Sequence, residues 1–324
     1  MRAIQMRNFG PPLEVLELIE LAEPAVPAAD EVLVGVEFAP INMNDLYLIE
    51  GVFPIRPTVP SVVGNEGVGR VLAVGRDVRD LQVGDRVLIP LYAFSWRERM
   101  VLPAKGLFAL PADADPRQLS MLSINPSAAA LLLREYVDLQ PGDWVAQNAA
   151  NSGVGRSVIA IAKSRGLRTI NFVRRAELVA ELKAAGGDIV LVDEAGVLDK
   201  VRQAVGDGRV PLGIDGVAGA ATATVAGALT QGGTIVTYAL MSGQPATINP
   251  MDLIAKRVIA KGFFQSYPEF EPKIPASVRE SVPLVASGAI HTPIAATYPL
   301  SAFHDAVAHV QRGGKVLFEI GGAV

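Results

Sequence analysis

The chain has 324 residues, of which 50% are hydrophobic and 19% are charged; this excludes a disordered protein, and the length is more than one core usually fills. The formal net charge of −4 gives no electrostatic reason to expect a nucleic acid or an acidic membrane as partner. Because there is no cysteine, a disulfide framework, a thiolate nucleophile and a cysteine-ligated metal centre are all excluded.

The first 122 residues are typical of a β-rich domain. Short apolar runs alternate there with Gly and Pro, and few stretches are long enough for a helix. Residues 42–50 are the exception and predict one or two helical turns. The predicted strands are residues 13–21, 31–38, 67–74, 86–90 and 96–102.

After Asn125-Pro126 the pattern changes to that of repeated βαβ units. Apolar β-branched runs of four to seven residues alternate with helical patterns of ten to fourteen, so we expect an α/β domain with a doubly wound parallel sheet of six strands. The predicted strands are residues 144–147, 169–173, 189–192, 213–215, 234–238 and 259–263, and the predicted helices are residues 155–164, 176–185, 197–205, 220–229 and 251–257.

The last stretch predicts two helices, at residues 278–287 and 302–311, and a closing strand at residues 316–320. It is too small to form a core alone, so we expect it to return to the first domain. The predicted division is a β-rich domain of residues 1–122 plus 266–324 and an inserted domain of residues 123–265.

The first of the six strands runs into a glycine-containing loop, residues 148–156, and then directly into a helix. A pyrophosphate binds well at such a helix N-terminus, because free backbone N–H groups and the positive end of the helix dipole meet there. The spacing varies the dinucleotide fingerprint, with Ala150 in the first glycine place and Arg156 in the last. The alternative is that Gly153 and Gly155 only make a tight turn.

The end of the second strand favours NADP over NAD. An acidic residue about 20 positions beyond the glycines would bind the ribose of NAD, whereas arginine accommodates the 2'-phosphate of NADP. Here Val173 is followed by Arg174 and Arg175, and the next acidic residue is Glu177. The alternative is that both arginines are solvated surface residues.

Taken together, these stretches resemble the medium-chain dehydrogenase/reductase superfamily over the whole chain. The resemblance implies a GroES-like β-rich catalytic domain with an inserted Rossmann domain. It rests on the loop described above and on Gly64-Asn65-Glu66-Gly67-Val68-Gly69, Val83-Gly84-Asp85-Arg86-Val87 and Gln140-Pro141-Gly142-Asp143-Trp144-Val145.

Members of that superfamily that use zinc bind it through Cys and His, and this chain lacks that set. Asn65 stands where the motif would carry a His ligand, and His291, His304 and His309 follow no metal-ligand pattern. We therefore expect no metal. Without a Lewis acid, bound NADPH is expected to deliver hydride to an already polarised acceptor, such as an alkene conjugated to a carbonyl.

Two zinc-free groups are similar to the chain. The closer is the mitochondrial-type trans-2-enoyl thioester (enoyl-CoA) reductase, matched by 124–126, 147–155, 167–171, 64–67 and 262–264. The other is the quinone oxidoreductase group, matched by Asn42, Asp45, Tyr47 and Gly51. The longer loop match places the enoyl reductase first and the quinone oxidoreductase second.

The resemblance also implies which residues bind the cofactor. They follow the carboxyl ends of the strands, where ligands of such sheets bind. For Tyr238 and Phe263 ordinary packing is the alternative, and Lys315 is equally consistent with an exposed strand-end lysine. The implied residues are Asn125, Asn151, Ser152, Gly153, Val154, Gly155, Arg174, Arg175, Tyr238, Ala239, Leu240, Met241, Phe263, Phe264, Gln265, Ser266 and Lys315.

One departure concerns catalysis. The resemblance assigns the proton-donating or carbonyl-orienting role to a tyrosine, and here that position is Phe53. A phenyl ring donates no hydrogen bond, and losing one such donor commonly costs roughly a hundredfold to a thousandfold in rate. Tyr47 is our first candidate for the missing donor, followed by Asn42, Asn44 and Tyr92, although each is equally consistent with packing.

Phe53 also keeps two other functions open. A quinone accepts hydride at or near oxygen and takes its proton from water or from the cofactor ribose, so it needs this donor less than a thioester does. A protein of another class, which binds NADPH without efficient catalysis, is the further alternative.

We expect a homodimer, by resemblance and because the sixth strand would be an apolar edge, and such edges tend to be paired or covered. No apolar stretch approaches the roughly 18 to 20 residues that cross a bilayer. The first six residues lack the apolar block of a signal peptide. A cytoplasmic protein that acts on a small-molecule enoyl thioester, enone or quinone is the resulting expectation.

Overall fold

The structure, a computed structural model, describes residues 1–322 and divides into two compact units. Unit 1 is discontinuous in sequence, whereas unit 2 is almost continuous. Unit 1 comprises Met1–Ile124, Val285–Ser287 and Thr292–Val324, and unit 2 comprises Asn125–Leu284 and Gly288–His291. The compact units do not test the predicted domain boundaries, so the boundaries at 122/123 and 265/266 stay a prediction.

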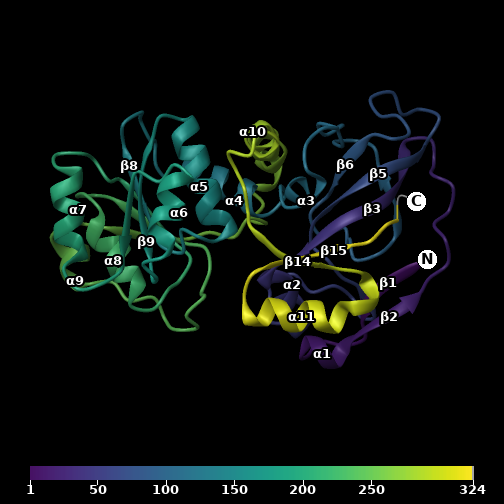
Figure 1. The fold of residues 1–324 in the computed structure, drawn as a ribbon, viewed down its shortest axis with the longest axis horizontal. Coiled ribbons are helices and arrows are strands. Elements are labelled where there is room, and N and C mark those ends of the chain that lie inside the picture. Colours follow the sequence, from purple (N-terminus) through teal and green to yellow (C-terminus); the bar gives the residue numbers. More distant parts are fainter. Residues whose placement is uncertain (323–324) are drawn as a thin grey trace. The chain divides into compact units, whose positions relative to one another are not determined.

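Unit 1 is built on two sheets, one of three strands and one of six (Figure 1). The smaller has the order β2-β1-β4; the larger has the order β14-β15-β3-β5-β6, with β7 also paired to β3. The strands are β1 (Arg2–Met6), β2 (Leu16–Glu20), β3 (Glu31–Ile41), β4 (Ser61–Val62), β5 (Gly67–Val74), β6 (Arg86–Ile89), β7 (Arg99–Pro103), β14 (Ile294–Tyr298) and β15 (Lys315–Glu319).

The helices of unit 1 are short, and two of them matter for the site. Helix α2 (Met43–Glu50) leaves the end of β3 directly, and α11 (Phe303–Arg312) leads into β15. The indole of Trp96 is fully buried in this unit and makes an edge contact with the ring of Phe318 at 5.1 Å between centroids. The remaining short helices are α1 (Pro12–Val15), α3 (Pro116–Leu119) and the 3-10 turn Leu300–Ala302.

Unit 2 contains one parallel sheet of six strands in the order β10-β9-β8-β11-β12-β13. This is the doubly wound order. The first strand, β8, lies at the centre; β9 and β10 follow on one side of it, and β11, β12 and β13 follow on the other. The strands are β8 (Trp144–Gln147), β9 (Arg168–Val173), β10 (Ile189–Val192), β11 (Leu212–Asp215), β12 (Thr234–Thr237) and β13 (Ile259–Gly262). The predicted fold class is confirmed.

Helices cover both faces of this sheet, with α5 and α6 on one side and α7 and α8 on the other (Figure 1). This explains why the strands are apolar along their length rather than alternating. The helices are α4 (Asn125–Glu135), α5 (Gly153–Ser164), α6 (Leu178–Ala184), α7 (Val197–Val205), α8 (Ala221–Ala228), α9 (Pro250–Ile254) and α10 (Ile274–Ala286), with the 3-10 turn Glu271–Lys273.

Several predicted elements have other bounds in the structure, and the prediction was furthest off at residues 13–21 and 96–102. Residues 13–21 do not form one strand, because Pro12 at the first helical position starts the turn α1 and β2 begins only at Leu16. The predicted strand at residues 96–102 begins at Arg99 instead. Helix α4 was missed altogether.

Candidate active site

The end of β3 brings together residues that lie far apart in the sequence. Because Val316 of β15 pairs with Ile41 of β3, Lys315 lies beside Asn42. Lys315 Nζ donates a hydrogen bond to Asn42 Oδ1 at 2.5 Å, and Asn42 Nδ2 donates to Glu66 Oε1 at 2.8 Å. Asn42 therefore links a cation to a fully buried carboxyl group.

A second buried carboxyl group, Asp45, adjoins this chain of contacts. Its Oδ2 accepts from the backbone N–H of Asn42 at 2.7 Å and its Oδ1 accepts from that of Asn65 at 2.8 Å. The other oxygen of Glu66, Oε2, accepts from the backbone N–H of Ile124 at 2.9 Å. All four carboxyl oxygens thus have a donor. We call Asn42, Asp45, Asn65, Glu66 and Lys315 the polar cluster.

Burial dominates the electrostatics of the polar cluster. It raises the pKa of Asp45 and that of Glu66 to about 7 each, since removal from water disfavours the charged carboxylate. It lowers the pKa of Lys315 for the same reason, against the attraction of the two carboxyl groups. The polar cluster therefore gains or loses a proton near neutral pH.

The predicted catalytic residues are all in unit 1 but differ in their surroundings. The side-chain amide of Asn42 uses both its oxygen and its nitrogen in hydrogen bonds inside the polar cluster. Tyr47 lies on α2, and its carbonyl accepts the backbone N–H groups of Val52 and Phe53 at 3.0 and 3.1 Å. The ring of Phe53 lies 6.4 Å from that of Tyr92 between centroids. Tyr47 thus positions the segment that carries Phe53.

Asp45, Glu66 and the position of Lys315 are what the sequence did not reveal. Asp45 follows Asn42 at the spacing of a helix cap, and Glu66 follows Asn65 in a glycine-rich motif. A helix-cap spacing and a glycine-rich motif are both recognised from neighbouring residues. The contact of Lys315 with Asn42 joins residues 273 positions apart, which no local pattern indicates.

In unit 2, the loop between β8 and α5 has the predicted strand–loop–helix arrangement. Ser152 Oγ accepts the N–H of Gly155 at 3.1 Å and so caps the helix. Within the described residues, the backbone N–H groups of Gly153 and Val154 have no partner. These first-turn groups are free to bind an anion. A Cβ at Gly153 would lie 2.7 Å from Asn125 Nδ2, so the predicted residue Asn125 lies directly against the loop.

A buried network supports this loop at the ends of β8 and β11. Asn148 Nδ2 donates to Asp215 Oδ1 at 2.6 Å, while Asn148 Oδ1 accepts the N–H of Gly216 at 2.8 Å. Asp215 Oδ2 accepts from Thr222 Oγ1 at 2.8 Å. Asp215 is fully buried and was not among the predicted residues, because a lone Asp at a strand end gives no distinctive pattern.

The other predicted cofactor residues of unit 2 lie in three loops. Tyr238 lies over Gly216, where a Cβ would come within 2.4 Å of its hydroxyl, and burial raises the pKa of Tyr238 to about 12. Arg174 and Arg175 are exposed at the end of β9, where Arg175 contacts Glu177 at 3.4 Å. Lys315 is the exception, because it belongs to the polar cluster of unit 1.

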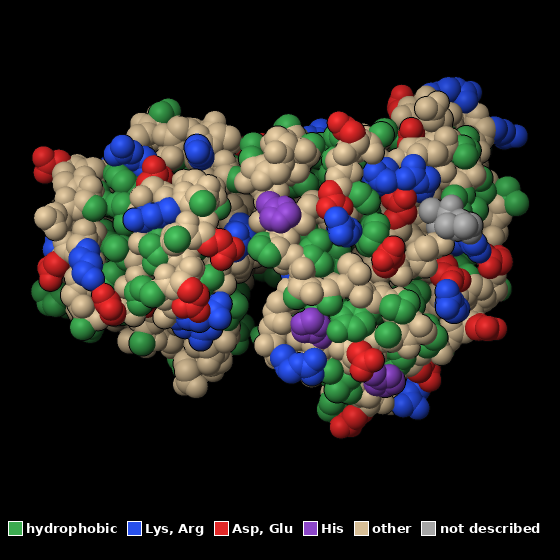
Figure 2. Space-filling view, viewed as in Figure 1, with side chains coloured by type: hydrophobic (Ala, Val, Ile, Leu, Met, Phe, Trp, Pro, Cys, Tyr) green, Lys and Arg blue, Asp and Glu red, His purple; other side chains and the backbone are tan. Residues whose placement is uncertain are grey.

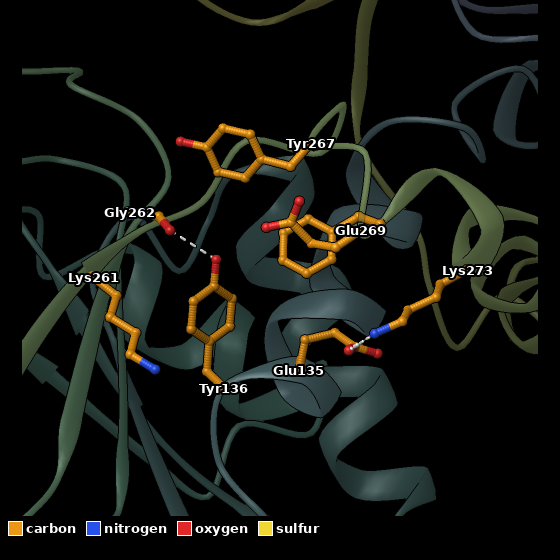
Figure 3. A pocket seen from close by; sticks show the side chains of 8 residues that line it. Glu135, Tyr136, Lys261, Gly262, Tyr267, Glu269 and Lys273 are labelled. Atoms are coloured by element: carbon orange, nitrogen blue, oxygen red, sulfur yellow. Dashed lines mark hydrogen bonds and ion pairs between the residues drawn. The ribbon is translucent and has the colours of Figure 1, made fainter.

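The segment after β13 is held by an aromatic cluster. Phe263 packs against Tyr136 and Phe270, with ring centroids 6.3 and 5.4 Å apart, and Gln265 Nε2 donates to Ser127 Oγ at 3.0 Å. A cavity of about 470 Å³ opens beside this cluster (Figure 3). None of the predicted site residues lines it. The lining residues are Glu135, Tyr136, Lys261, Gly262, Tyr267, Glu269, Phe270 and Lys273.

Lys and Arg side chains are interspersed with Asp and Glu on the face shown in Figure 2, which is not the pattern of a nucleic-acid interface. Among residues 1–322, no three His, Cys, Asp or Glu side chains are grouped as metal ligands. The helices of the same part of the chain are each too short or too polar to span a bilayer.

The two units and the glycine loop together define a medium-chain dehydrogenase/reductase. Residues 28–112 match the family described as alcohol dehydrogenase GroES-like domain, and residues 153–286 match the zinc-binding dehydrogenase family. The chain belongs to the family of the mitochondrial enoyl-[acyl-carrier-protein] reductases. The mouse member is 36% identical over 318 residues, which cover 95% of this chain and 84% of the mouse protein.

Solved structures agree with this assignment. The complex of the enoyl thioester reductase Etr1p with NADP and crotonyl-CoA superposes with a TM-score of 0.88 at 26% identity, covering 98% of this chain and 99% of that chain. The quinone oxidoreductase of Escherichia coli in complex with NADPH has a TM-score of 0.81 at 26% identity, covering 98% and 100%. The resemblance predicted from the sequence is confirmed.

The predicted cytoplasmic localisation was wrong. The curated relatives from rat, mouse and Caenorhabditis elegans are named as mitochondrial proteins and point to mitochondria instead. The prediction rested on the lack of a secretory signal and of a membrane span, and neither property distinguishes one aqueous compartment from another.

The raised pKa values predict a pH dependence of stability. The folded chain holds the protons of Asp45 and Glu66 more tightly than the unfolded chain, so the free energy of unfolding should fall as pH rises from about 4 to about 7. For Glu66 the shift from 4.5 to about 7 corresponds to roughly 3 kcal/mol. Lys315 acts with the opposite sign, at alkaline pH.

The measurement is the Tm of the wild type and of Glu66→Gln at pH 5 and pH 8. The Tm of the wild type should fall further between pH 5 and pH 8 than that of the variant. In the variant only Asp45 loses a proton, whereas in the wild type Asp45 and Glu66 both do. Glu181→Gln, at an exposed position of α6, is the matched control and should behave as the wild type. Equal losses in wild type and Glu66→Gln would contradict the assignment.

Proposed function

We propose that this protein is an NADPH-dependent, zinc-independent reductase of conjugated carbonyl compounds, with 2-enoyl thioesters as the first substrate class. The observation that carries the proposal is membership of the enoyl reductase family over 95% of the chain. The similarity to a structure that holds both NADP and crotonyl-CoA supports the same pairing of cofactor and substrate.

Residues of unit 2 fit NADP(H). The free N–H groups of Gly153 and Val154 suit its pyrophosphate, and Arg174 and Arg175 suit the 2'-phosphate. Bound NADPH supplies a hydride to the β-carbon of the alkene, and a proton taken up at the α-carbon completes the saturated thioester and NADP⁺. The predicted contacts at Asn151, Ser152, Gly155, Tyr238–Met241 and Phe263–Ser266 belong to the same proposal.

Zinc does not fit the polar cluster. Its donor atoms are carboxyl and amide groups, without the Cys and His that zinc members use, and Asn65 stands in the His position. The ammonium group of Lys315 contacts Asn42 inside the cluster and would repel a divalent cation. The chemistry therefore proceeds through side chains and the nicotinamide cofactor.

A quinone is the second candidate acceptor. Phe53 favours it, because its ring, which contacts Tyr92, donates no hydrogen bond to a thioester carbonyl. The similarity to the quinone oxidoreductase of Escherichia coli supports it as well.

The proposal is tested by NADPH oxidation measured separately with crotonyl-CoA and with a naphthoquinone. We expect turnover of crotonyl-CoA, and a higher rate with the quinone would make it the preferred acceptor. Tight NADPH binding without turnover of either compound at millimolar concentration would instead identify a binding protein without efficient catalysis and would sink the proposal.

The arginine pair should set the cofactor preference. In Arg174→Ala/Arg175→Ala, the KM for NADPH should rise roughly a hundredfold or more, since two charge-assisted hydrogen bonds to a phosphate, of about 1.5 to 3 kcal/mol each, are lost. The KM for NADH should stay unchanged. Arg202→Ala removes an equally exposed arginine from α7 and serves as the control. Equal effects on both cofactors would show that the pair does not bind the 2'-phosphate.

A homodimer through β13 is part of the proposal. This strand is exposed along its length at the edge of the sheet, and the solved Etr1p/Etr2p structure from Candida tropicalis is a heterodimer. The N–H groups of Ile259 and Phe263 point to β12, so by alternation those of Ala260 and Gly262 point outward. The hydroxyl of Tyr136 already occupies the outward carbonyl of Gly262 (Figure 3).

Ala260→Pro should therefore disrupt the dimer without unfolding the sheet, because it removes an N–H group that faces away from β12. Light scattering at micromolar concentration should give a dimer for the wild type and a monomer for the variant, with an unchanged circular dichroism spectrum. A monomeric wild type, or a dimeric variant, would refute pairing through this strand.

A further inference from the structure

Asn65 is a buried amide with unused hydrogen-bonding capacity. Its side chain is 1% exposed, and neither Oδ1 nor Nδ2 has a partner. Among the described residues, Asn44 Oδ1 is the other buried side-chain atom in this state. A buried polar atom without a partner has lost its hydrogen bonds to water and gained none in the protein, which costs free energy. Such atoms are therefore rare unless a ligand or a water bonds to them.

The position of Asn65 is nevertheless fixed. Its N–H donates to Asp45 Oδ1 at 2.8 Å, and its carbonyl accepts the N–H of Tyr92 at 2.9 Å. Gly64, just before it, holds a φ of +101° and lies so close to Trp96 that a Cβ would be 2.2 Å from the indole. A fixed backbone means that the unpaired amide is not a consequence of a loose loop.

The other uncharged amide and the carboxyl groups of the polar cluster have no comparable capacity. Both oxygens of Asp45 and both of Glu66 accept hydrogen bonds within the cluster or from neighbouring backbone, and the amide of Asn42 is bonded at both ends. Besides the charged Lys315, Asn65 is thus the member from which an external group can receive a hydrogen bond.

The surroundings of Asn65 indicate what kind of group that is. The residue bonded to its carbonyl, Tyr92, carries a ring 6.4 Å from that of Phe53, the position where the resemblance places a donor that this chain lacks. The Phe53–Tyr92 ring pair beside a neutral N–H donor suits the conjugated carbonyl of an uncharged acceptor.

We propose that Asn65 is a catalytic residue whose Nδ2 donates a hydrogen bond to the carbonyl oxygen of the acceptor. This inference rests on the proposed function. As hydride reaches the acceptor, that oxygen gains negative charge, and a preorganised N–H donor in a dry environment stabilises it. The amide transfers no proton; the proton that completes the product comes from water.

The side chain of Asn65 is 1% exposed, so an acceptor reaches Nδ2 only when a neighbouring side chain moves aside.

The test compares Asn65→Ala and Asn65→Asp with the wild type. Both variants lack the N–H donor, and kcat for crotonyl-CoA, or for a naphthoquinone if that is the acceptor turned over, should fall roughly a hundredfold to a thousandfold with an unchanged KM for NADPH. The Tm of Asn65→Ala should equal or exceed that of the wild type, because the substitution removes an amide that makes no bonds.

Asn171→Ala is the matched control for the Tm. Asn171 is equally buried, but it donates to Thr169 Oγ1 and the Ile189 carbonyl and accepts from Gln147 Nε2, at 2.7 to 3.0 Å. Its removal should lower the Tm by several degrees. The difference in Tm between the two variants distinguishes an amide that binds a ligand from one that stabilises the fold.

Two results would overturn the inference while leaving the proposed function intact: a kcat of Asn65→Ala within threefold of an active wild type, or a Tm that falls as it does in Asn171→Ala. The second result would mean that an internal water or the fold itself uses the amide. A wild type without turnover of either acceptor would instead overturn the proposed function, and this inference with it.

Discussion

The bond between Lys315 and Asn42 is the interaction on which the arrangement of the polar cluster depends. It places an ammonium group close enough to Asp45 and Glu66 to oppose the rise in pKa that burial causes in both carboxyl groups. The bond forms because β15 pairs with the end of β3, so the register of these two strands determines which charged groups meet in the polar cluster.

Much of the fold was predictable from local pattern. The bounds of β5, β8, β10 and α7 in the structure are those that apolar runs and turn residues indicate, because burial on one or both faces determines such patterns. Helix α4 escaped prediction because its Ala- and Leu-rich sequence is buried almost all round and shows no alternation of apolar and polar faces.

The candidate site was less accessible to sequence reasoning. The glycine loop and the exposed arginines follow from local spacing, whereas Asp45, Glu66 and Asp215 each look like an ordinary cap or strand-end residue. Their role depends on partners brought together by sheet register, and register is a property of the whole unit. The resemblance placed Lys315 with the cofactor residues, while its burial in the polar cluster required the structure.

The pairing of β15 with β3 also has a consequence for synthesis of the chain. The parallel sheet of unit 2 uses a nearly continuous stretch and has all its strands once residue 262 has left the ribosome. The larger sheet of unit 1 lacks β14 and β15 until residues 294–319 are translated, and Asp45 and Glu66 lack the nearby ammonium group of Lys315 until then. Domains fold as units during synthesis. Unit 2 is therefore able to fold before the larger sheet of unit 1 is complete.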